Sequence, residues 1–207
     1  MTMSTASPLL LDGSHVCFAG LALTPDELAD SLQRFLSTGK TARTPQIEGK
    51  GELLIAQGFE DAEAVMAFIY EVCHWGGFTG ISGRVRKHND EAAIHDRFLA
   101  ARAALGTDEP DLKTAIREVR ALKGLGLSFA SKHLRMLWPQ HCPILDSQLH
   151  EKLGYPMNAT GYDNLARDCR VVAGSLAKEG VANPARGGQP VWYVADVESA
   201  VFRRVRP

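Results

Sequence analysis

Residues 121–132 read ALKGLGLSFASK, in which two glycines separated by one leucine join two helical patterns. Glycine tolerates positive φ and leaves no side chain over a turn, so a helix that ends here can restart at once and form a hairpin. The backbone N–H groups at the start of the second helix then point outward, and amides at a positive helix end bind phosphate. An ordinary turn between two helices has the same pattern, so the hairpin alone leaves both interpretations open.

Basic side chains surround this hairpin, although the whole chain is nearly neutral. The formal net charge of −1 is not typical of a protein that coats nucleic acid. Between Lys113 and Arg135, however, six Lys or Arg residues stand against one acid, Glu118. The local charge therefore favours an anionic ligand at the hairpin.

An aspartate follows the hairpin at a defined distance. The residues Pro143-Ile144-Leu145-Asp146 precede a predicted helix over 147–153. Asp146 is placed to cap that helix, and the amides of its first turn favour the ionised carboxylate. A structural cap and a functional carboxylate are both compatible with this position.

The hairpin and the aspartate together resemble the helix-hairpin-helix (HhH-GPD) superfamily of DNA glycosylases. The family hairpin reads L-P-G-[VI]-G, and in its endonuclease III and MutY groups the catalytic Asp lies 20 residues after the second glycine. Here Gly126 plus 20 is Asp146, and residues 143–146 are similar to the P-I-L-D of MutY. The resemblance covers about residues 111–154. Weaker similarities, at 75–77, Arg84 and 192–198, are to bacterial proteins of the 8-oxoguanine glycosylase (OGG) fold.

The resemblance implies an all-α, two-lobed fold with the DNA groove between the lobes. It also implies an enzyme that removes a damaged or modified base, such as an oxidised purine, flipped out of double-stranded DNA. Cleavage of the base–sugar bond passes through an oxocarbenium-like state. The Asp146 carboxylate would either stabilise that state or activate the attacking water. The expected DNA contacts are Lys123, Gly124, Gly126, Ser128 and Arg84, and the expected wall or wedge beside the flipped base consists of Trp75 and Phe78.

Two positions of the hairpin depart from the family pattern. Bifunctional members carry a Schiff-base lysine two residues after the last glycine, where this chain has Ser128, so we expect a monofunctional, hydrolytic glycosylase. Lys132 lies four residues further on and on the same helical face, from which it could reach the pocket. We favour a phosphate or solvent contact for Lys132. Lys123 replaces the family's proline and suits phosphate binding.

Composition limits the remaining expectations. The four cysteines lie far apart and include no C-x2-C pair, so we expect free, mostly buried thiols and no metal or redox cofactor. The chain has no run of about 18 apolar residues, so we expect no membrane span. We expect a monomer located in the cytoplasm and associated with the nucleoid.

Helix caps and breakers predict the remaining elements. Thr24-Pro25-Asp26-Glu27 and Asp61 each predict a helix start. We expect an N-terminal segment, 1–50, that packs on a main body, 51–207, with a loop at 40–50 and a basic loop or short irregular helix at 78–89. The hairpin is expected at 111–138 and the helix of the aspartate at 146–154. Other expected elements are helices at 90–105, 111–122, 127–137, 147–153 and 162–178, a strand at 191–194, and a helix at 197–204 capped by Asp196.

Three other functions stay open at this stage. The chain could be a non-catalytic helix-hairpin-helix module that binds DNA. It could be a glycosylase with AP lyase activity that uses Lys132. It could also be a glycosylase that acts on hypermodified phage bases in anti-phage defence.

Overall fold

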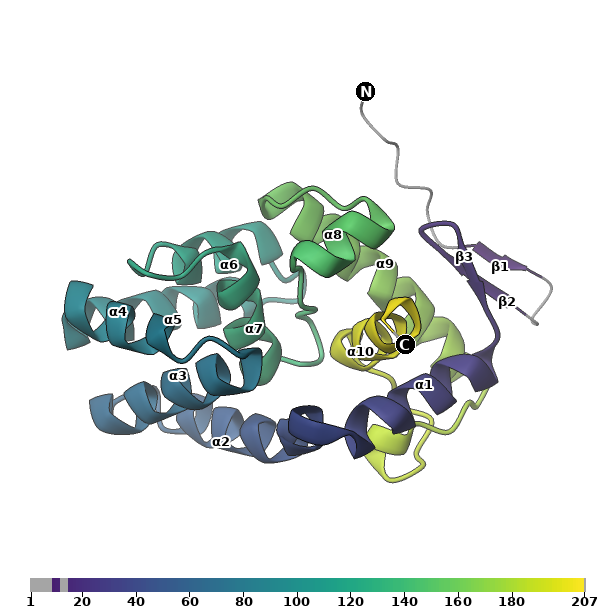
Figure 1. The fold of residues 1–207 in the computed structure, drawn as a ribbon, viewed down its shortest axis with the longest axis horizontal. Helices are drawn as coiled ribbons and strands as arrows, with labels where there is room; N and C mark the ends of the chain where they lie inside the picture. The colour runs from purple at the N-terminus through teal and green to yellow at the C-terminus, as the bar shows by residue number, and fades with distance from the viewer. Residues whose placement is uncertain (1–8, 12–14, 207) are drawn as a thin grey trace.

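The computed structural model of the chain describes residues 9–11 and 15–206 and is mostly helical (Figure 1). It confirms the predicted all-α fold class with a short strand element. The helices are α1 (Pro25–Ser37), α2 (Thr44–Ala56), α3 (Ala62–Gly76), α4 (Gly80–His88), α5 (Glu91–Leu105), α6 (Leu112–Arg120), α7 (Leu127–Leu137), α8 (Ser147–Leu153), α9 (Ala159–Lys178) and α10 (Val194–Val205), with 3-10 helices η1 (Gly39–Arg43) and η2 (Pro184–Arg186).

The helices form two groups, which meet where α6 packs against α9 (Figure 1). One group contains α2 to α6, and the other contains α1, α8, α9 and α10. Helix α7 packs against α2, α3 and α6, whereas α1 lies along α10, and α10 also contacts α8 and α9. The chain passes between the groups at η1 and at the loop between α7 and α8. The first turns of α7 and α8 and one face of α10 line the same cavity.

The strand element lies at the N-terminus and not at 191–194 as predicted. Strands β1 (Leu9–Leu11), β2 (His15–Phe18) and β3 (Leu21–Leu23) form an antiparallel sheet in sequential order. Residues 192 and 193 are irregular, and α10 begins at 194, because the Asp196 carboxylate accepts a hydrogen bond from the Tyr193 N–H at 3.0 Å. Asp196 therefore lies inside the first turn of α10. The sequence had predicted that the helix begins after Asp196, and that prediction was wrong.

The predicted loop at 40–50 was also wrong, because η1 and α2 occupy this stretch. Pro45 lies in the first turn of α2, where the missing N–H breaks no helical hydrogen bond. Ile47 is fully buried and anchors the helix in the core. Helix α2 runs across residue 50, the boundary expected between the N-terminal segment and the main body; residues 1–8 and 12–14 of that segment lie outside the described residues.

Several helix starts agree with the predicted capping signals. Thr24 and Glu27 form a capping box at α1, and the Asp61 side chain accepts a hydrogen bond from the Ala64 N–H at α3. The basic stretch at 78–89 contains the regular helix α4. None of the helices in the described part of the chain has both the length and the apolar composition needed to cross a bilayer.

Candidate active site

The two glycines of the hairpin between α6 and α7 have different roles. Gly124 has a φ of +104°, and a Cβ added there would lie 3.2 Å from the Cβ of Arg84 and from the backbone N of Val85. Gly126 has a φ of −84°, and no atom lies within 4 Å of the place its Cβ would occupy. The prediction that glycine allows positive φ is therefore confirmed for Gly124 alone, and Gly126 leaves an open surface above the start of α7.

Asn89 holds the hairpin turn against α4. Its side-chain oxygen accepts a hydrogen bond from the Lys123 N–H at 2.9 Å, and its amide donates to the Lys123 carbonyl at 3.0 Å. No side chain caps the first turn of α7 at Gly126. Arg84 is exposed beside Gly124, so the residues expected to contact DNA around the hairpin lie close together on the surface, with the first-turn amides of α7 uncapped.

Asp146 is the N-cap of α8, as predicted. Its Oδ1 accepts hydrogen bonds from the N–H groups of Gln148 and Leu149 at 3.1 and 3.2 Å. The preceding residue is fixed to α7, because the Leu145 N–H donates to the Ser131 hydroxyl at 3.1 Å. One carboxylate oxygen is thus used by the cap, and the other, Oδ2, faces Lys132.

The carboxylate lies in the wall of a cavity of about 470 Å³, a size typical of small-molecule sites. Lys132 lies in the same cavity, and its Nζ is 3.6 Å from Asp146 Oδ2, which is ion-pair distance but longer than a hydrogen bond. The Lys132 ammonium donates to the Ser128 hydroxyl at 2.8 Å. The hairpin helix and the α8 cap therefore bring an amine and a carboxylate together inside one cavity.

Of the two contacts that the sequence favoured for Lys132, phosphate or solvent, the structure does not support the solvent contact, because the side chain is buried. Its side chain is 9% exposed, and its Nζ lies 5.1 Å from the centre of the Phe129 ring. Burial lowers the pKa of the Lys132 amine, while the charges of Asp146 and Glu198 act in the opposite direction. Ser128, expected to contact DNA, is half-buried at the cavity wall and is the hydrogen-bond partner of this lysine.

Aromatic side chains form another part of the wall. Trp75 is buried, and its indole N–H donates to the Thr44 hydroxyl at 3.2 Å. Phe78 is 66% exposed and packs edge-to-face on Phe129, with the ring centres 6.0 Å apart. A Cβ at Gly76 would lie 2.6 Å from the Phe129 ring, so the close approach of α3 to α7 needs glycine there. Trp75 and Phe78 thus both line the cavity, Trp75 as a fixed wall and Phe78 exposed to solvent.

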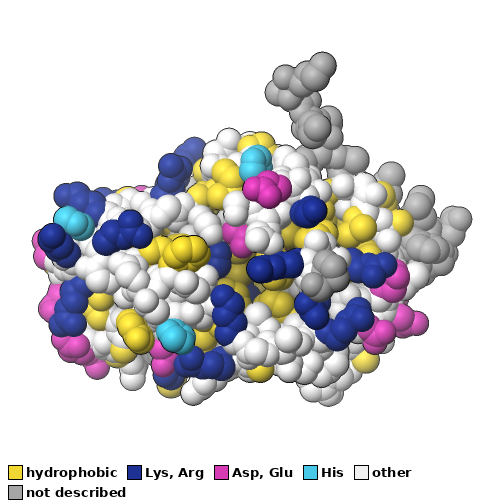
Figure 2. All heavy atoms as spheres, viewed as in Figure 1, with side chains coloured by type: hydrophobic (Ala, Val, Ile, Leu, Met, Phe, Trp, Pro, Cys, Tyr) yellow, Lys and Arg dark blue, Asp and Glu magenta, His cyan; other side chains and the backbone are white. Residues whose placement is uncertain are grey.

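Sequence reasoning missed several cavity residues because distant segments supply them. Glu198 of α10 is 2% exposed and lines the cavity. The sequence did contain a signal for Glu198. Residues 194–201 are apolar except for Asp196, Glu198 and Ser199, and a polar side chain in a buried helix is costly unless it has a partner or a function. Figure 2 shows a hollow near the middle of one face, with Lys and Arg side chains around it. The missed basic side chains that line the cavity are Lys40, Arg203 and Arg206.

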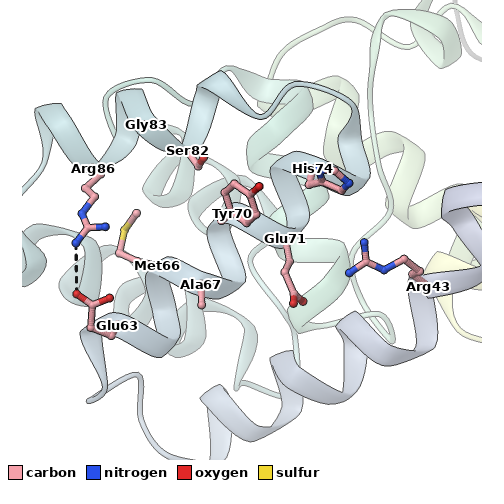
Figure 3. Close-up of a pocket in the computed structure, with 10 residues that line it drawn as sticks. All are labelled: Arg43, Glu63, Met66, Ala67, Tyr70, Glu71, His74, Ser82, Gly83 and Arg86. Carbon is pink, nitrogen blue, oxygen red and sulfur yellow. Dashed lines mark hydrogen bonds and ion pairs between the residues drawn. The ribbon is translucent and has the colours of Figure 1, made fainter.

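A second, more open cavity of about 530 Å³ lies between α3, α4 and η1 (Figure 3). In it His74 stacks on the exposed Tyr70 ring, away from the cavity of Asp146. Its two acids are paired: Glu63 lies 3.4 Å from Arg86, and Glu71 bonds Lys50. This cavity contains neither Asp146 nor Lys132, so the smaller one is the candidate active site.

The four cysteines are free thiols, and three of them are buried. Within residues 9–11 and 15–206, no three His, Cys, Asp or Glu side chains are grouped so that they could hold a metal ion. Comparison of the chain with protein-family models, curated proteins and solved structures finds no match. The hairpin, the cavity and the resemblance of the sequence motifs are therefore the features that point to a function.

Proposed function

We propose that the protein is a DNA glycosylase that removes a damaged or modified base flipped out of double-stranded DNA. The observation that carries this proposal is the position of Asp146, whose Oδ2, not used by the helix cap, lies beside Lys132 in a partly aromatic cavity next to the glycine hairpin. An enzyme that acts on a base within a duplex needs such a cavity, because the target must leave the base stack. Release of free base from duplexes that carry a panel of lesions, oxidised purines included, tests the activity.

The cavity side chains have separate roles in the proposed reaction. As the glycosidic bond breaks, its electron pair leaves with the base, and positive charge develops on the deoxyribose. The Asp146 carboxylate stabilises that charge or activates the water that adds to C1′. The water's proton passes to the departing base, so the products are the free base and an abasic site. Trp75 and Phe129 offer apolar surface to the extruded base.

Backbone and basic groups on both sides of the cavity would hold the DNA strand. The uncapped amides at the start of α7 suit one phosphate, with Lys123 and Arg84 nearby. Lys40, Arg203 and Arg206 suit phosphates on the opposite side of the cavity. With four free thiols, the chain fits a reducing location, and we propose that it acts on nucleoid DNA in the cytoplasm as a monomer.

A matched pair of glycine substitutions tests the hairpin. Gly126→Ala is expected to fold like the wild type, because its φ is ordinary and its surroundings are open, yet to weaken binding to duplex DNA by about 10-fold or more through the methyl group placed at the phosphate. Gly124→Ala is expected to lower the free energy of unfolding by about 1–3 kcal/mol, because alanine is strained at positive φ. Urea denaturation and fluorescence anisotropy measure the two effects. Equal DNA affinity of Gly126→Ala and wild type would contradict phosphate binding at this turn.

A second candidate function, a glycosylase with AP lyase activity, is favoured by the burial of Lys132 beside Asp146. A lysine whose pKa is lowered by burial has more of the neutral amine that can attack C1′. The new N–C1′ bond forms as the glycosidic bond breaks, and the base leaves with the electron pair and takes a proton from water. The C1′–O4′ bond then breaks, and O4′ takes a proton from the nitrogen, which leaves a protonated Schiff base. Ser128, at the family's lysine position, would then orient Lys132 through their hydrogen bond.

Borohydride trapping distinguishes the two candidates. If Lys132 is the nucleophile, reduction during turnover is expected to leave a covalent protein–DNA adduct, which Lys132→Met abolishes. Lys178→Met is the control, since Lys178 is exposed at the end of α9 and does not line the cavity, and it should retain the adduct. Base release without an adduct in the wild type would assign the reaction to water. DNA binding without release of any base, hypermodified phage bases included, would favour a non-catalytic module.

A further inference from the structure

One carboxyl oxygen of Glu198, a residue of the cavity wall, is buried without a hydrogen-bond partner among the described residues. The Oε2 atom of Glu198 is buried and makes no hydrogen bond to any described residue. A buried carboxyl oxygen without a partner is costly, so the group needs a physical reason for its place. Glu198 lies on the face of α10 that lines the cavity, deeper than Lys132 and Asp146, as its 2% exposure shows.

Charged and titratable groups from three neighbouring helices face this carboxyl. The Ile144 backbone N–H and the charge of Arg135 both favour the ionised carboxyl, but Arg135 is bonded to Glu48. The groups close enough to interact electrostatically with Glu198 are Lys132 and Arg135 from α7, Asp146 from the N-terminus of α8, and Tyr162 and Cys169 from α9.

The balance of these groups keeps the carboxyl protonated at neutral pH. Burial raises the pKa of Glu198 to about 8, and Asp146 acts in the same direction; Arg135, the Ile144 N–H and Lys132 act against the rise. Because the pKa is raised, the proton is held below about pH 8 and lost above it. Ionisation of Glu198 therefore adds one negative charge to the cavity as the pH rises through this range.

We propose that Glu198 is a positioning residue that sets the charge of Lys132. While Glu198 holds its proton, Asp146 is the carboxylate that acts on the amine; once Glu198 ionises, a second anion holds Lys132 as an ammonium ion. A neutral Glu198 therefore favours the amine with a free electron pair, the form that can attack a sugar carbon. The effect on the charge of Lys132 is a property of the chain itself, while its consequence for base removal rests on the proposed function.

The charge of Lys132 can be measured directly in the full chain without DNA. Lysine is labelled with ¹³C at Cε, the signal of Lys132 is identified by its loss in Lys132→Met, and its titration is followed by NMR. In Glu198→Gln, which keeps the shape but never ionises, the midpoint for Lys132 is expected to fall by about one pH unit or more, because a nearby opposite charge shifts a pKa by roughly 1–3 units. Glu109→Gln, at an exposed site, is the matched control and should leave the midpoint unchanged. An unchanged midpoint in folded Glu198→Gln overturns the proposal.

A second measurement uses the wild type and does not depend on the variant folding. With glutamate labelled at the side-chain carboxyl carbon, one resonance is expected to titrate near pH 8, and the Lys132 signal should shift in the same pH range. If every glutamate titrates below about pH 6, near the ordinary range, the proposal is wrong. Neither experiment involves base release, so its outcome is independent of whether the protein proves to be a glycosylase.

Discussion

Asp146→Asn is expected to lower the rate of base release by about 100-fold or more, because it removes the negative charge that faces the developing oxocarbenium ion. Removing one electrostatic group that acts on a transition state typically costs about 10²–10³ in rate. Asparagine still caps a helix, so α8 should keep its start and the protein its fold. The measurement is single-turnover release of free base from the lesion duplex on which the wild type is most active.

The control for this substitution is another aspartate with the same capping role. Asp90 is the N-cap of α5 and accepts a hydrogen bond from the Ala93 N–H at 2.7 Å, but it does not line the cavity. Asp90→Asn should therefore release base at the wild-type rate. Thermal unfolding of both variants separates loss of chemistry from loss of the cap. Equal rates for wild type and Asp146→Asn would sink the catalytic assignment.

The parts of the site that the sequence predicted are those encoded by local signals. The capping role of Asp146 follows from a single acid before a helical pattern, and the hairpin follows from two glycines two residues apart. Both depend on residues a few positions apart, so no long-range packing was needed to predict them. The starts of α1 and α3 were predicted for the same reason.

The residues that sequence reasoning misjudged depend on contacts between distant segments. Lys132 is buried in part because Gly76 lets α3 approach closely; a Cβ there would lie 3.2 Å from the Lys132 side chain. Glu198 reaches the cavity from a helix that begins more than 40 residues after Asp146. No local pattern contains this information, since the spacing of charges along one helix does not reveal which other helix covers it. The function itself stays a proposal, as the hairpin and the cavity support it without testing it.

A buried ionic network fixes the last helix against α2, and breaking it should have the largest effect on stability. Arg135 is 1% exposed and bonds the Glu48 carboxylate, which also lies 3.3 Å from Arg186. Arg186 in turn bonds Asp196 at 2.9 Å. Arg135→Met is expected to lower the free energy of unfolding by about 3–5 kcal/mol, because it leaves a buried carboxylate without its main partner. Urea denaturation measures the change.

The loss in free energy of unfolding should depend on how deeply the ion pair is buried and not on the distance between its charges. A second, exposed ion pair of the chain tests this expectation. Arg97 lies 2.6 Å from Glu118, but the arginine side chain is 45% exposed, so Arg97→Met should cost less than about 1 kcal/mol. Exchanging both buried partners, Arg135→Met with Glu48→Leu, should recover part of the loss, since the double variant leaves no unpaired charge between them. Equal losses from Arg97→Met and Arg135→Met would show that the desolvated carboxylate is not the cause.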